Sequence, residues 1–123
     1  MTSARYDRSE EILFIYNTCL TSFIEIANAS REYFLNNEVP KKLKILEFAT
    51  AEPSKMSLKE RAKLKPIPNI WIENFSSIRH AVISTDLSIV VNVLLLQKEI
   101  SHSKYAINIF STEPAARRWL SEK

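Results

Sequence analysis

The stretch IRHAVISTDLSIVVNVLLLQKEISHSKYAINIFSTEPAARRWL, residues 78–120, decides the fold class. Residues 78–84 have a nearly continuous apolar centre, which is typical of a strand covered on both faces. Residues 86–99 form an amphipathic helical pattern behind a capping Asp86, and we expect this helix to be well buried because its apolar face is broad. Residues 105–110 alternate at strand period, and the following Ser-Thr-Glu-Pro predicts the start of a last helix.

The N-terminal half continues the same alternation of strands and helices. Residues 12–17 are β-branched and aromatic and predict a core strand, while residues 2–6 could form a hairpin with it as an edge strand. Residues 21–37 have apolar side chains on one helical face and predict an amphipathic helix. A further strand is expected over residues 43–48, and a loop over residues 49–56, which lack periodicity.

The middle of the chain predicts two short helices. Ser57-Leu58-Lys59-Glu60 fits a capping box, so a helix is expected to begin at Ser57. Pro66 and Pro68 interrupt it because proline removes an amide donor and restricts the residue before it. A second helix is expected over residues 69–75. The complete order predicts one α/β domain over residues 1–123, with a four- or five-stranded, mostly parallel sheet and covering helices.

Composition supports a single folded domain. The chain has 123 residues, of which 46% are hydrophobic and 25% charged, values close to the globular average. Its longest uninterrupted apolar run, residues 12–16, is far shorter than the roughly 20 residues that a membrane span needs. The single Cys19 allows no internal disulfide, and the charged N-terminus lacks the apolar core of a secretory signal. We therefore expect a cytoplasmic protein.

The chain contains no glycine, and this excludes several common sites. The phosphate-binding P-loop, the dinucleotide fingerprint and the Gly-flanked nucleophile elbow all need backbone positions that only glycine fits comfortably. The sequence therefore predicts no nucleotide cofactor and no hydrolase of that type. Other enzymes are not excluded by this argument.

The C-terminal third resembles a known family. The residues that carry the resemblance are the core strand His80-Ala81-Val82-Ile83-Ser84, the helix after Asp86, and residues 105–120, in which a strand ending in Phe-Ser-Thr-Glu precedes a helix with Ala and Trp-Leu. These features resemble the SpoIIAA-like family, a branch of the STAS-type α/β domains that is also similar to the CRAL-TRIO fold. Weaker agreement extends upstream to residues 20–23. The resemblance implies a sheet with helices on its faces, used to bind protein partners or apolar ligands.

Two serines are candidate phosphoacceptors. In anti-sigma-antagonist STAS domains, the resemblance implies a phosphorylatable serine where a core strand meets the next helix, commonly in an Asp-Ser-Gly setting. The matching region contains Ser54 and Ser57 but neither the Asp-Ser pair nor glycine, which argues against a phospho-switch. Ser57 would gain from a phosphate at a helix N-terminus, but an ordinary N-cap is the favoured interpretation because such caps are common.

Two further surfaces are candidates for binding. A basic segment could attract nucleic acid or an anionic membrane surface, but a solvated helix face is the favoured interpretation. Nucleic acid is not expected because no aromatic residues are interleaved with the basic ones. An apolar stretch near Pro66 could belong to the core or present a partner surface, for instance of a homodimer. The basic residues are Lys55, Lys59, Arg61, Lys63 and Lys65, and the apolar ones are Ile67, Trp71 and Phe75.

Catalytic residues are the last candidates. His80 and His102 have no ligands at metal-binding spacing, so no metal site is predicted. A histidine acts as a base only beside an orienting acid, which the fold would have to bring close. We expect a non-catalytic binding or regulatory module, not an enzyme, that takes a protein partner or an apolar small ligand without a cofactor. The alternatives are a small enzyme assembled from His80, Glu47 and Ser84, or an anion-binding protein.

Overall fold

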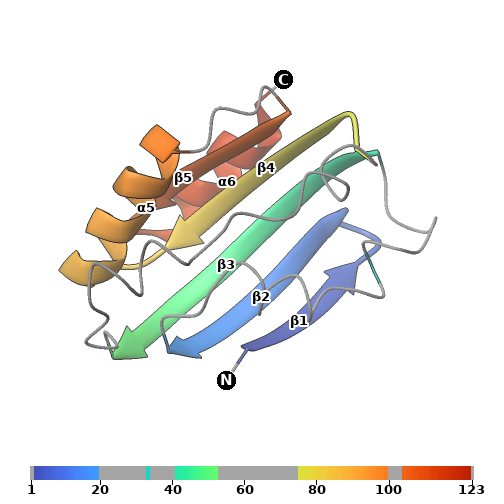
Figure 1. Cartoon of the computed structure of the whole chain (residues 1–123). Coiled ribbons are helices and arrows are strands. Elements are labelled where there is room, and N and C mark those ends of the chain that lie inside the picture. The colour runs from blue at the N-terminus through green and yellow to red at the C-terminus, as the bar shows by residue number, and fades with distance from the viewer. Residues whose placement is uncertain (1, 20–32, 34–40, 53–74, 100–103, 123) are drawn as a thin grey trace.

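Five strands form one sheet in the order β1-β2-β3-β4-β5 (Figure 1). The computed structural model describes residues 2–19, 33, 41–52, 75–99 and 104–122. β1 runs antiparallel to β2, and the other neighbours pair in parallel, so the predicted α/β class with a mostly parallel sheet is confirmed. The elements are β1 (Thr2–Asp7), β2 (Ile12–Cys19), β3 (Lys42–Glu52), β4 (Ser77–Ile83), α5 (Leu87–Glu99), β5 (Tyr105–Phe110) and α6 (Glu113–Ser121).

The turn between β1 and β2 is built around Asp7. Its carboxylate accepts hydrogen bonds from the backbone N–H groups of Ser9 and Glu10, at 2.9 and 3.0 Å, and from the Ser9 hydroxyl at 2.6 Å. These bonds, the one from the Ser9 hydroxyl foremost, lower the pKa of Asp7. Glu11 closes the turn with a φ of 58°, and Asp7 pairs with Ile12. The predicted hairpin is therefore present.

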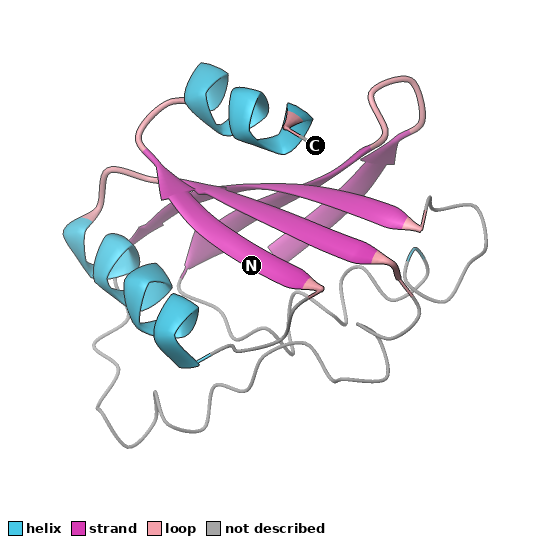
Figure 2. Cartoon of the chain, turned by 90° about the horizontal axis from the view of Figure 1, so that it is seen from above, coloured by secondary structure: helices cyan, strands magenta, loops and turns pink. Residues whose placement is uncertain are grey.

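The sheet has an apolar core on each face, and in the described part of the chain α5 lies on one face and α6 on the other (Figure 2). Alternation along the strands separates the two sets of side chains, because successive residues point to opposite faces. The α5 face includes Leu13, Ile15, Leu43, Ile45, Ile78, Val82, Tyr105 and Ile107. The α6 face includes Ile12, Phe14, Leu46 and Ala81.

Helix α5 begins as predicted but is less buried than expected. Asp86 accepts a hydrogen bond at 3.4 Å from the backbone N–H of Ile89, and so caps the helix. Ile89 and Val93 are buried against the sheet, whereas the side chains on the outer side are exposed. The expectation of a well-buried helix is therefore wrong for its outer side, because a helix lying on a sheet buries only one stripe.

Helix α6 is fixed at both ends. The Thr112 hydroxyl caps its first turn by accepting from the Ala115 N–H at 3.4 Å, and Pro114 lies in that turn, as predicted. At the other end, Arg79 of β4 donates to the Trp119 carbonyl at 2.6 Å and stacks over the Trp119 ring at 4.2 Å. Leu120 is buried and Trp119 is partly buried against the sheet.

One boundary differs clearly from the prediction. Residues 49–56 were expected to form a loop, but β3 continues to Glu52 and pairs with β2 as far as Cys19. Residues 49–52 carry no strong apolar alternation, so their strand conformation comes from pairing with the neighbouring strand. The predicted strand 78–84 ends one residue earlier, at Ile83.

The remaining helix predictions fall mostly outside the described residues. Of the helix expected over residues 21–37, only Tyr33 is described; it is helical and packs on Tyr6 with ring centroids 6.2 Å apart. The helix expected from Ser57 lies outside the described residues. Phe75, the expected end of the next helix, lies in a bend and not in a helix. No helix in the described part of the chain is long and apolar enough to cross a membrane.

Candidate functional site

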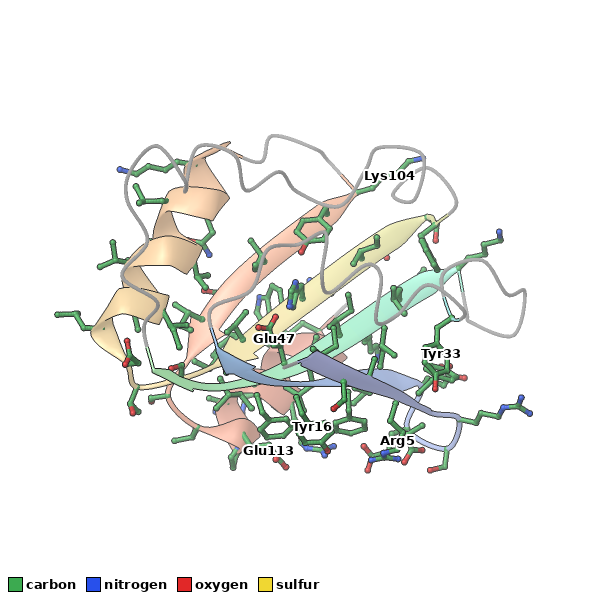
Figure 3. The ribbon with its side chains drawn as sticks, turned by 60° about the horizontal axis from the view of Figure 1, so that its bottom comes forward. Arg5, Tyr16, Tyr33, Glu47, Lys104 and Glu113 are labelled. Carbon is green, nitrogen blue, oxygen red and sulfur yellow. The ribbon has the colours of Figure 1, made fainter. Side chains whose placement is uncertain are left out.

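Three buried polar side chains form a chain of hydrogen bonds across neighbouring strands. His80 of β4 lies between Glu47 of β3 and Tyr105 of β5. Its Nε2 is 2.7 Å from Glu47 Oε1, and its Nδ1 is 2.6 Å from the Tyr105 hydroxyl. All three side chains point to the α5 face, and Figure 3 shows Glu47 on the side of the sheet opposite Tyr16 and Arg5.

The register of the parallel strands explains this diagonal arrangement. His80 is paired with Ile45 of β3, and Tyr105 with Ile78 of β4. On β3, Glu47 lies two residues after Ile45, the residue that pairs with His80. On β5, Tyr105 lies two residues before Ile107, which also pairs with His80. A step of two residues keeps a side chain on the same face, so the three polar groups meet within one layer of the core.

The chemistry of the groups sets the direction of the hydrogen bonds. An ionised carboxylate only accepts, so His80 donates to Glu47 through its Nε2–H. The other ring nitrogen, Nδ1, meets the Tyr105 hydroxyl, which can donate to a neutral ring or accept from a protonated one, so each ring nitrogen has a partner. Burial raises the pKa of Tyr105 well above its usual value, and the charge of Glu47 raises it further, so the phenol stays protonated.

This arrangement links three neighbouring strands through buried polar side chains. His80 is 0% exposed, Glu47 is 6% exposed, and both ring nitrogens already have protein partners. A general base must come within hydrogen-bond reach of the proton that it removes. The orienting acid that His80 requires is therefore present, but the side chain lies out of reach from the solvent.

A pocket of about 490 Å³ lies at the carboxyl ends of the parallel strands, further along β3 and β4 than the Glu47–His80 pair. It forms where the chain leaves β4 toward α5 on one face and leaves β5 toward α6 on the other (Figure 2). Ligands of open α/β sheets bind where adjacent connections diverge in this way, because the divergence opens a crevice. The pocket is lined by Phe48, Ala49, Ile83, Ser84, Thr85, Asp86 and Ser111.

Ser84 connects the two sides of the crevice. Its backbone N–H donates to the Phe110 carbonyl at 3.0 Å, which joins the end of β4 to the end of β5. Its hydroxyl accepts from the Asp86 N–H at 3.1 Å. A serine hydroxyl that accepts a hydrogen bond keeps its own proton, so Ser84 can donate a hydrogen bond to a ligand in the crevice.

The lining combines an apolar part with a polar part. Phe48, Ala49 and Ile83 supply the apolar surface, and the polar surface carries three hydroxyl groups and the Asp86 carboxylate. Such a mixture suits a small molecule with an apolar body and a hydrogen-bonding group. In the described part of the chain, no group of three or more His, Cys, Asp or Glu side chains is placed to hold a metal ion.

The predicted site residues have different outcomes. Of the three proposed for a scattered active site, Glu47 and His80 are brought together, whereas Ser84 lines the crevice instead. Phe75 is buried in the core of the α5 face, which is one of the two alternatives considered for it. The other candidates lie outside the described residues: Ser54, Ser57, Ile67, Trp71, Lys55, Lys59, Arg61, Lys63 and Lys65.

Sequence reasoning missed Tyr105 and most of the crevice. Tyr105 was identified only as a strand residue. It is the first of the inward-pointing residues in an apolar strand, and a buried tyrosine hydroxyl usually needs a hydrogen-bond partner. Thr85, Asp86 and Ser111 follow directly after strands, and polar residues at such ends are the available signal for a crevice.

Fold and site together define an α/β protein with a mixed sheet, a buried Glu-His-Tyr chain and a crevice at the strand ends. Comparisons with known protein families, with curated proteins and with solved structures found no match for this chain.

Proposed function

We propose that this chain is a non-catalytic binding domain that takes a small, partly apolar ligand in the crevice at the carboxyl ends of β4 and β5. The observation that carries the proposal is the pocket of about 490 Å³ at the point where the two connections diverge. This volume falls within the range of roughly 300–1,000 Å³ that is typical of small-molecule sites. A resident ligand would lie against Phe48 and Ile83 and donate a hydrogen bond to Asp86.

Two features support binding in preference to catalysis. The only histidine in the described part of the chain has both nitrogens engaged and is fully buried, so it offers no base to a ligand in the crevice. The Ser84 hydroxyl in the crevice accepts from the backbone N–H of Asp86, and a backbone amide cannot activate a hydroxyl as a base would.

We also propose that the domain is of the SpoIIAA-like type. Its antiparallel edge strand, the four parallel strands that follow in sequential order, and the helices on both faces support this assignment. The resemblance of residues 80–84 and 105–120 to that family supports it as well. The family uses such domains for protein partnership or apolar ligands, and the crevice favours the second.

An NMR titration with phenol tests the binding proposal. Phenol combines an apolar ring with a hydroxyl donor, which matches the two parts of the lining. In the ¹⁵N-labelled full chain we expect saturable shift changes at the amides of Ile83, Ser84, Thr85 and Ser111. Shift changes that are spread over the surface, or that do not saturate, would overturn the proposal.

Variants make the titration specific. Ala49→Leu fills the crevice from its wall and should abolish the shift changes, and Thr85→Leu does the same from an exposed position if the first variant unfolds. Ala106→Leu makes the same chemical change at an exposed position of β5 that does not line the crevice, and should bind phenol as the parent chain does. Equal binding by a folded Ala49→Leu or Thr85→Leu chain would contradict the proposed site.

A further inference from the structure

The outer side of α5 carries a regular apolar stripe that faces solvent. Leu87, Val91 and Leu94 are 75%, 41% and 46% exposed, and Lys98 follows at the C-terminal end. The four positions are spaced by four, three and four residues. This is the spacing of the a and d positions in a helix that packs against another helix, and we call these four residues the α5 seam.

The opposite side of α5 packs against the sheet. Ile89 and Val93 are buried in the core, and Gln97 donates to the Ile107 carbonyl at 2.7 Å. These three positions hold the helix along its length against β5 and the neighbouring core. Rotation of α5 could therefore not bury the seam, and its apolar side chains are presented outward on a fixed support.

The seam is nearly symmetric about Val91. If a second copy lies antiparallel across it with the two-fold axis at Val91, Leu87 of one copy faces Leu94 of the other, and the reverse. A two-fold interface uses the same patch on both subunits, so a patch must be complementary to itself. The positions of the two leucines satisfy this condition.

The charges at the two ends of α5 favour the antiparallel direction. Asp86 lies just before the helix and Lys98 in its last turn. In an antiparallel pair the partner's Lys98 lies at the same end of α5 as Asp86, and the two helix dipoles are opposed favourably. A parallel pair would instead bring Lys98 beside the partner's Lys98 and Asp86 beside the partner's Asp86.

We propose that the α5 seam is the interface of a homodimer in which the two helices pack antiparallel about Val91. A single pair of helices buries less surface than the roughly 1,200–2,000 Å² of standard stable interfaces, so the dimer should dissociate on dilution. The interface itself does not depend on ligand binding.

Sedimentation velocity of the full chain without ligand tests the interface. From micromolar to near-millimolar concentration, the mass should rise from the 14.2 kDa of one chain toward twice that value. Val91→Glu and Leu94→Glu should remain monomeric throughout, whereas Tyr16→Glu, at an exposed position on the α6 face, should dimerise as the parent does. A monomer at every concentration would overturn the proposal, and so would a dimer that persists in both seam variants.

Disulfide trapping tests the direction of packing. In a chain whose only cysteine is replaced by Cys19→Ser, Val91→Cys should cross-link with itself under oxidation. Leu87→Cys and Leu94→Cys chains should cross-link when mixed and much less when oxidised separately. Self-linking of Leu87→Cys as efficient as in the mixture would contradict the antiparallel arrangement. A monomeric Leu94→Glu chain with a strongly lowered unfolding midpoint would show that Leu94 packs within its own chain. That result would overturn the proposed dimer interface.

Discussion

Nε2 of His80 lies 2.7 Å from Oε1 of Glu47, and the two side chains meet between neighbouring strands in the core of the α5 face. They are separated by 33 residues in the chain, so their contact depends on the pairing of β3 with β4. Buried polar groups in such a position are satisfied only in one register, because a slip of one residue would turn each of them to the other face. The pair therefore specifies the register of the central strands.

The first prediction concerns the energy of this pair. Glu47→Ala and His80→Ala should each destabilise the chain by about 1–3 kcal/mol, because each removes one side of the buried hydrogen bond between them. The double variant should lose less than the sum, by about 0.5–3 kcal/mol of coupling. Chemical denaturation measures all three. Glu122→Ala, which removes an exposed partner of Arg79, should cost less than about 1 kcal/mol. Strict additivity of the two core variants would refute the coupling.

The second prediction concerns Tyr105 and alkaline pH. The pKa of Tyr105 in the folded chain is raised well above the usual 10.0, first by burial and then by Glu47. As the pH rises, the unfolded chain therefore releases this proton first, which favours unfolding. The stabilising contribution is complete below the unfolded-state pKa and is lost as the pH rises toward the folded-state pKa.

Two measurements check this behaviour. The ultraviolet titration of the native chain should lack the tyrosinate signal of Tyr105 until the chain unfolds, and Tyr105→Phe should remove that late step. Stability should also fall less steeply above about pH 10 in Tyr105→Phe than in the parent. Tyr16→Phe is the control, since its ring is partly exposed. A full tyrosinate signal in the folded parent near pH 10 would contradict the burial of this hydroxyl.

The third prediction concerns the attachment of α6 to the sheet. Arg79 combines a hydrogen bond to the Trp119 carbonyl, a cation–π contact with the Trp119 ring and an ion pair with Glu122 at 3.6 Å. A lysine cannot supply the planar stacking and the directed N–H groups together. Arg79→Lys should therefore cost about 1–3 kcal/mol of stability, whereas Arg118→Lys at an exposed position of α6 should change it by less than about 0.5 kcal/mol. Equal effects in thermal unfolding would argue against the role of Arg79.

The strands were largely predictable because each is a short apolar segment between polar breaks. Residues 12–17 and 105–110 illustrate this, and the structure contains a strand at each place. The caps of α5 and α6 were also predictable, since Asp86 and Thr112 act on the backbone next to them. Local signals of this kind need no knowledge of the rest of the fold.

The features that depend on distant pairing were not predictable in the same way. The extension of β3 to Glu52 follows from its pairing with β2, and the meeting of Glu47, His80 and Tyr105 follows from the parallel register. Helix α5 was expected to be well buried because its apolar face is broad, whereas the sheet covers only one side of it. The α5 seam is the part of the helix that this difference exposes.

The proposed ligand site is tested most directly by an isotope-filtered NOE experiment on the labelled chain with phenol. The crevice predicts NOEs from the phenol ring protons to the methyl groups of Ala49 and Ile83, which line it from β3 and β4. Leu87 and Val91, which are exposed and apolar but lie on the α5 seam, should give none. NOEs to the seam without any to Ala49 and Ile83 would contradict the account, because phenol would then be reporting exposed apolar surface and not a binding site.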